Sequence, residues 1–121
     1  MKEIDIHVGY NPRTLKERVL KAVRRAETGA RVDERHITFE SWEGLAKTLT
    51  SKRLQLLKYL HASPAASIAE LARALGRDYR RVQADVGILS AAGLISIMDN
   101  GEIRADYDEI RASITLLPPA A

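Results

Sequence analysis

The 121-residue sequence predicts an α+β fold from three patterns. Segments near both ends alternate apolar and polar residues, as half-buried strands do. The middle of the chain carries apolar residues at helical spacing between helix start and stop signals. Asn100-Gly101 then stands between two short apolar runs, which indicates a β-hairpin with a two-residue turn. At this length we expect one core-forming domain with a small extension.

The extension comprises residues 1–35, which we expect to form a strand followed by a helix. Residues 2–8 alternate, so that their apolar side chains share one face. Asn11-Pro12 combines an N-cap side chain with a proline suited to the first helical position. The helix that follows has an apolar stripe, and its opposite face carries six basic residues: Arg13, Lys16, Arg18, Lys21, Arg24 and Arg25. We expect this extension to serve dimerisation or partner binding.

Residues 36–117 form the predicted main domain, which begins with a short strand at 37–39. A side chain able to cap a helix stands at each expected helix start: Ser41, Thr50 or Ser51, Ser67 and Asp78. We expect Trp42 and Phe39 to pack in the core. Residues 118–121, with the sequence Pro-Pro-Ala-Ala, are expected to be a flexible tail.

Two adjacent helices in the second half of the chain have the pattern of a helix-turn-helix unit. Ser67 and Glu70 have the spacing of a capping box, in which Glu70 reaches back to the backbone N–H of Ser67. Gly76 permits a left-handed turn between the helices, and Gly93 ends the second helix. Residues 94–105 then contain the expected hairpin.

This stretch resembles the winged helix-turn-helix transcriptional regulators of prokaryotes, in the broad MarR/ArsR grouping. The positions that carry the resemblance are Ile68, Leu71, Ala72, Leu75, Gly76, Val82, Leu89, Gly93, Leu94 and Ile95. A wider pattern from His36 to Leu116 is similar to small DNA-binding regulators, some of which look like antitoxins. The resemblance implies a sequence-specific double-stranded DNA-binding regulator, a repressor that acts as a homodimer through recognition helix 78–92 and wing 94–105. The alternative is an antitoxin that binds and neutralises a partner toxin and represses their shared operon.

A helical wheel indicates which side chains of the second helix would face DNA. With Val82 directed to the core, the outward positions are Arg80, Ala84 and Gly87. The candidate base-contacting residues are Arg77, Arg80, Gln83 and Ala84, because Arg pairs with guanine, Gln with adenine, and a small side chain permits close approach. The candidate phosphate-binding residues are Tyr79, Arg81, Arg104, Lys52 and Arg53. Asp85 lies four residues after Arg81, so we expect an ion pair between them.

The charge pattern predicts weak binding by a single subunit. Of the 19 basic residues 13 are Arg, but five Arg between residues 66 and 105 are balanced by five acidic residues. Because non-specific affinity for DNA comes from neutralising phosphates, a neutral module needs a second copy. We expect the strand at 2–8, the strand at 109–116, or both, to extend the sheet of the partner subunit.

Two other interpretations of the same residues stay open at this point. The second helix is also compatible with an ordinary amphipathic helix that exposes an Arg-rich face. The other interpretation is a winged helix that contacts only protein, because a fold does not determine a function.

Several classes of function are disfavoured by what the sequence lacks. There is no Cys for a disulfide, a thiolate zinc site or a cysteine nucleophile, which suits a reducing cytoplasm. The common phosphate-loop, dinucleotide, hydrolase and metalloprotease motifs are missing, so we expect neither an enzyme nor a cofactor. His7, His36 and His61 are expected on separate elements far apart, with no metal between them. No run of apolar residues is long enough to span a bilayer, so we expect no membrane partner.

Overall fold

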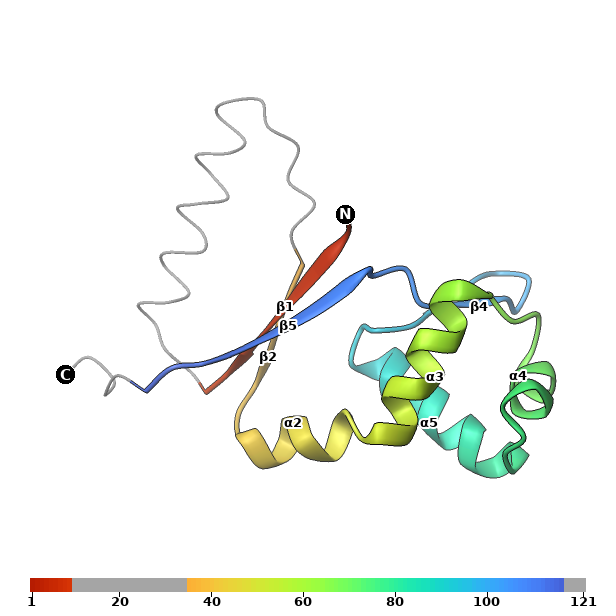
Figure 1. Ribbon diagram of the computed structural model, residues 1–121, viewed down its shortest axis with the longest axis horizontal. Helices are drawn as coiled ribbons and strands as arrows, with labels where there is room; N and C mark the ends of the chain where they lie inside the picture. Colours follow the sequence, from red (N-terminus) through yellow and green to blue (C-terminus); the bar gives the residue numbers. More distant parts are fainter. Residues whose placement is uncertain (10–34, 117–121) are drawn as a thin grey trace.

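The computed structural model describes residues 1–9 and 35–116 as a mixed α/β structure (Figure 1). In chain order its elements are β1 (Glu3–Val8), β2 (Arg35–Phe39), α2 (Trp42–Thr48), α3 (Ser51–Ala62), α4 (Ile68–Leu75), α5 (Tyr79–Ala91), β3 (Ser96–Ile97), β4 (Ile103–Arg104) and β5 (Glu109–Ile114). This mixture agrees with the predicted α+β class. The helix expected after Asn11-Pro12 and the expected C-terminal tail lie outside the described residues. Within the described ranges, no helix has both the length and the apolar character needed to cross a bilayer.

The three longer strands form one parallel sheet in the order β2-β1-β5. In this register Ile6 of β1 lies opposite Ile37 of β2 on one side and Ala112 of β5 on the other. The prediction that the strand at 2–8 extends a partner's sheet is therefore wrong, because both edges of β1 are already paired within the chain. β5 pairs with β1 along one edge only, and it is an outer strand of the sheet formed by the described residues.

The alternation in β1 gives the sheet one apolar and one polar face. Ile4, Ile6 and Val8 are buried, whereas the residues between them are only half-buried. Ile6 and Val8 pack with Leu45 of α2. The apolar face therefore packs against α2, which runs from the end of β2 to the start of α3 (Figure 1).

A second set of buried residues joins the three helices α3, α4 and α5 to the rest of the chain. Its largest members include Leu56, Leu60, Leu71 and Leu89, and Ile4 of β1 belongs to the same cluster. The helical part and the sheet thus share buried apolar contacts. The predicted boundary after residue 35 separates β1 from β2 and β5, although the structure places all three in one sheet.

The helix starts follow the capping pattern of the sequence. The side chains of Ser41, Thr50, Ser67 and Asp78 each accept a hydrogen bond from the backbone N–H three residues later. One detail of the capping box differs, because Glu70 accepts from the backbone N–H of Ala66 and not from that of Ser67. Gly76, with a φ of 64°, ends α4 in the left-handed region, as expected for the turn between α4 and α5.

The hairpin between β3 and β4 has a longer loop than the sequence indicates. The backbone N–H of Met98 donates to the carbonyl of Glu102, which leaves a three-residue loop of residues 99–101 in place of a two-residue turn. Gly101 closes the loop with a φ of 90°, the left-handed position that three-residue hairpin loops place last. Ala65 bridges to Ile103 on the other side of β4, so the hairpin is anchored to the segment between α3 and α4.

The expectation that Trp42 packs in the core is wrong. Its side chain is 53% exposed at the first position of α2, whereas Leu45 is the residue of that helix that is buried against the sheet. Phe39 is half-buried and packs against the cluster that contains Leu45. The apolar stripe of α2 is therefore narrow, and Trp42 lies outside it.

Replacing Ile6 by Ala tests whether the central strand supports the fold. The side chain is fully buried, so Ile6→Ala should lower the free energy of unfolding by about 2–5 kcal/mol. The matched control is Ile97→Ala in β3, where the side chain is 52% exposed and the expected loss is below about 1 kcal/mol. Urea denaturation measures both, and equal losses would contradict the placement of the core.

Candidate nucleic-acid interface

α5 presents one buried face and one exposed face, in the orientation that the helical wheel predicts. Val82, Val86 and Leu89 are at most 1% exposed and pack into the core. Arg80 and Gln83 lie on the exposed face. A long cationic side chain and an amide therefore project from the first two turns of a helix that is firmly seated on its other side.

The middle of this exposed face carries small residues. Ala84 and Gly87 follow Arg80 at helical spacing and are exposed. A Cβ built on Gly87 meets no atom within 4 Å, so packing within the described residues does not require glycine there. Glycine inside a helix costs about 1 kcal/mol relative to Ala. Gly87 therefore lowers the stability of the helix without serving the packing of the described residues.

The other side of α5 is fixed by an ionic cluster around Asp85, which is only 8% exposed. Nε of Arg53, in α3, donates to Oδ1 of Asp85 at 2.9 Å. Nη2 of Arg77, in the turn between α4 and α5, donates to Oδ2 at 2.7 Å. Nη1 of Arg53 also donates to the carbonyl of Lys47 at 2.6 Å and to that of Thr48 at 3.2 Å. One carboxylate therefore connects α5 to the end of α2, the first turn of α3 and the turn that precedes α5.

The two arginines keep Asp85 ionised. Burial alone raises the pKa of this carboxyl, but the hydrogen bonds from Arg77 and Arg53, together with their positive charges, outweigh burial and hold the pKa below its ordinary value of 3.8. A buried carboxylate without such partners would be strongly destabilising. The stabilisation it provides is present above its ordinary pKa and is lost as the pH falls through the lowered value.

This cluster changes the set of candidate DNA contacts. Arg77, expected to contact bases, and Arg53, expected to contact phosphate, both have their guanidinium groups on Asp85, and each side chain is only 16% exposed. The expected ion pair between Asp85 and Arg81 is replaced by these two contacts. Arg53 is 32 residues from Asp85 in the sequence, so helical spacing carried no signal for this pair.

The remaining candidate residues lie on three elements. The exposed side of the first two turns of α5 carries five of them: Tyr79, Arg80, Arg81, Gln83 and Ala84. Lys52 is exposed beside Arg53 in the first turn of α3. Arg104 is exposed in β4, where a hydrogen bond from its Nε to Glu102, and the charge of that carboxylate, raise the pKa of Arg104. Glu102 also offsets the charge of Arg104, so α5 carries the more strongly cationic part of this surface.

Histidines that were expected far apart meet on the polar face of the sheet. His7 and His36 lie on neighbouring strands with their rings stacked 5.5 Å apart, and Nε2 of His7 is 3.3 Å from Nδ1 of His36. Nδ1 of His7 also lies 3.0 Å from Oγ of Ser113. Among residues 1–9 and 35–116, no group of three or more His, Cys, Asp or Glu side chains has the arrangement of a metal site.

Comparison with known proteins assigns a family to this part of the chain. The model of the HVO_A0114 family matches residues 48–112, which is more than half of the chain and covers α3, α4, α5 and the hairpin. No curated protein and no solved structure matches the chain. The matched segment contains Asp85, both of its arginine partners and the exposed face of α5.

Asp85→Asn tests the ionic cluster. The substitution preserves shape but leaves two mostly buried guanidinium groups without a counter-charge, so we expect a loss of about 3 kcal/mol in the free energy of unfolding at pH 7. Because the pKa of Asp85 is lowered, the advantage of the parent chain should shrink as the pH falls below 3.8. Urea denaturation from pH 7 to pH 3 measures both effects. Glu43→Gln, at an exposed position of α2, is the control and should change little; an equal effect of the two variants would contradict the cluster's role.

Proposed function

The chain belongs to the HVO_A0114 family, and we propose that it is a sequence-specific double-stranded DNA-binding regulator of transcription. The observation that carries the proposal is the exposed face of α5, where Arg80 and Gln83 project beside the small residues Ala84 and Gly87. Arginine and glutamine side chains can hydrogen-bond to base edges, and small neighbouring residues allow the helix to approach the bases closely. This combination suits a helix that enters the major groove.

The order of the elements supports the same proposal. A helix, a tight left-handed turn at Gly76 and a second helix precede the antiparallel hairpin β3–β4, as in a winged helix-turn-helix domain. In this proposal α5 is the recognition helix and the hairpin is the wing. Asp85 contributes by fixing the angle of α5 against α3 and the turn, since a recognition helix must be rigid relative to its supporting helices.

Individual contacts follow from the positions of the side chains. Arg80 is suited to O6 and N7 of guanine, and Gln83 to N6 and N7 of adenine. Tyr79 and Arg81 lie at the sides of the first turns, where phosphates flank the groove. Lys52 and Arg104 extend the phosphate contacts to α3 and the wing. Arg53 and Arg77 act through Asp85 and are not part of this set.

We infer that the regulator acts as a homodimer, and the resemblance to winged helix-turn-helix regulators supports the proposal that it is a repressor. One recognition helix contacts only a few base pairs, and two copies contact half-sites about 34 Å apart. β5 pairs with β1 along one edge, and its other edge has no partner strand within the described sheet. This outer edge of β5 therefore suits the dimer contact. Ile114 of β5 is 50% exposed and adds apolar surface there. The antitoxin hypothesis is the alternative, and it rests on the resemblance alone.

Arg80→Ala tests the major-groove contact. Loss of a bidentate contact to guanine should weaken binding to the preferred duplex by about 1–3 kcal/mol and relax sequence preference at one position. Arg73→Ala is the matched control, since Arg73 is also exposed but lies on α4. Binding to a fluorescent duplex, titrated over salt concentration, measures both variants. Equal and small effects would show that α5 does not enter the groove.

Substitutions at Gly87 separate stability from DNA binding. Because a Cβ there meets open space, Gly87→Ala should raise the free energy of unfolding by about 0.5–1 kcal/mol through helix propensity. Gly87→Leu should likewise leave the fold intact but weaken DNA binding at least about tenfold, because the longer side chain holds the helix away from the groove. Thermal unfolding and duplex binding provide the two measurements. A Gly87→Leu variant that binds DNA like the parent would place this face of α5 away from the duplex.

A further inference from the structure

The apolar face of the sheet is covered at β1 but not at β5. In the register of the sheet, Ala112 and Ile114 of β5 lie beside Ile6 and Val8 of β1. Ile6 and Val8 are buried, whereas Ala112 is exposed and Ile114 is 50% exposed. The described part of the chain therefore leaves the apolar side of β5 open at the outer edge of the sheet.

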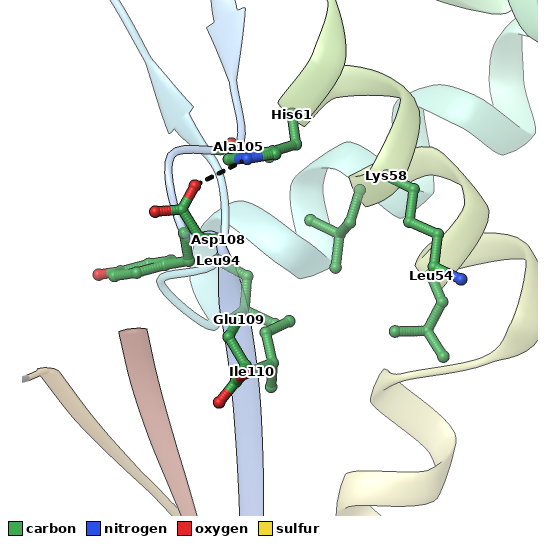
Figure 2. Close-up of a pocket in the computed structure, with 10 residues that line it drawn as sticks. Leu54, Lys58, His61, Leu94, Ala105, Asp108, Glu109 and Ile110 are labelled. Atoms are coloured by element: carbon green, nitrogen blue, oxygen red, sulfur yellow. Dashed lines mark hydrogen bonds and ion pairs between the residues drawn. The ribbon is translucent and has the colours of Figure 1, made fainter. Parts of the chain in front are cut away.

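A cavity of about 390 Å³ lies next to this open strand, between α3 and the beginning of β5. Leu54 of α3 and Ile110 of β5 lie on opposite sides of it, and its walls are almost entirely apolar (Figure 2). Ile110 shares the face of β5 that carries Ala112 and Ile114, because side chains alternate along a strand. An apolar side chain that packs against Ile110 from the outer edge of β5 would therefore also border the cavity.

The backbone edge of β5 lacks the features that usually keep a second strand away. The strand has the sequence Glu-Ile-Arg-Ala-Ser-Ile, with neither a proline nor a lysine. Its basic residue, Arg111, is directed inward, because Nη2 donates to Oε1 of Glu3 in β1 at 3.1 Å and Nε donates to Glu109. The charge of Arg111 is thus balanced within the chain, on the side of β1. An unpaired edge of this kind is a template for another strand.

The sequence of β5 selects one register in which two copies can pair antiparallel. Apolar residues lie opposite apolar residues only when one residue of the strand lies opposite its own counterpart. Pairs centred on Arg111 or on Ala112 use the greatest length of β5 under this condition. Centring on Arg111 places two like charges opposite each other, which is destabilising. Centring on Ala112 places Ile110 opposite the partner subunit's Ile114, and Arg111 opposite the partner subunit's Ser113.

We propose that the outer edge of β5 binds β5 of a second copy of this chain, antiparallel and centred on Ala112, so that Ile114 of the partner subunit packs against Ile110 beside the cavity. The occupant is a second copy because the strand is complementary to itself in this register. A two-fold axis repeats each contact, so Ile114 of the first copy packs against Ile110 of the partner subunit. The inference rests on the homodimer of the proposed function, and its tests use no DNA.

Cysteine cross-linking tests the register, and the chain has no cysteine of its own. In Ala112→Cys the two substituted residues lie opposite each other with Cα atoms about 4.5–5.5 Å apart, a distance that a disulfide spans. Mild oxidation should convert most of this variant into a covalent dimer on a non-reducing gel. Ile114→Cys is the matched control and should stay a single chain, because its two copies lie about 13 Å apart along the strands. No cross-linking of Ala112→Cys, or equal cross-linking of both variants, would overturn the proposal.

Sedimentation of the 121-residue chain without DNA measures the apolar contact. Ile114→Asp should raise the Kd of the dimer at least about tenfold, because pairing would bury an unpaired carboxylate beside Ile110. Ile97→Asp is the control, since Ile97 is 52% exposed but lies in β3, and it should leave the Kd unchanged. Both residues are exposed in the single chain, so both variants should fold, which circular dichroism checks. A parent chain that is monomeric at every concentration tested, or equal Kd values for the two variants, would overturn the proposal. Either result would leave the DNA contacts of α5 to be decided by duplex binding alone.

Discussion

The carboxylate of Asp85 is the constraint on which the geometry of the helical part depends. It is nearly buried, and it accepts hydrogen bonds from Arg53 of α3 and from Arg77 of the turn before α5. Because Arg53 also donates to the carbonyls at the end of α2, four segments meet around one charge. Burial of Val82, Val86 and Leu89 holds α5 against the core, but the hydrophobic effect that drives this burial is not directional. The ionic cluster supplies the directional contacts that fix the orientation of the helix.

The same cluster determines which charges are left for a partner. Two of the arginines near α5, Arg53 and Arg77, have their guanidinium groups held on Asp85, so the exposed basic side chains of the helix are Arg80 and Arg81. The proposed DNA surface is therefore small, and it relies on shape at Ala84 and Gly87 as much as on charge. A small surface of this kind agrees with the proposal that two copies act together.

The sequence was sufficient to predict features that depend on neighbouring residues. The caps at Ser41, Ser67 and Asp78, the left-handed turn at Gly76 and the outward face of α5 all follow from local spacing. Contacts between distant segments could not be predicted from local spacing. Alternation in β1 indicates a buried face, but it does not say that β2 and β5 are its partners. The partners of Asp85, the meeting of His7 with His36 and the exposure of Trp42 depend likewise on how distant elements pack.

Selection of bound duplexes from a random pool by the 121-residue chain tests most directly whether α5 is a DNA-recognition helix. We expect an enriched motif with two-fold symmetry, whose half-sites are separated by about one turn of the double helix, or roughly 34 Å. Each half-site should contain guanine and adenine positions suited to Arg80 and Gln83. A pool that shows no enriched sequence after repeated rounds would contradict the assignment of α5 as a DNA-recognition helix.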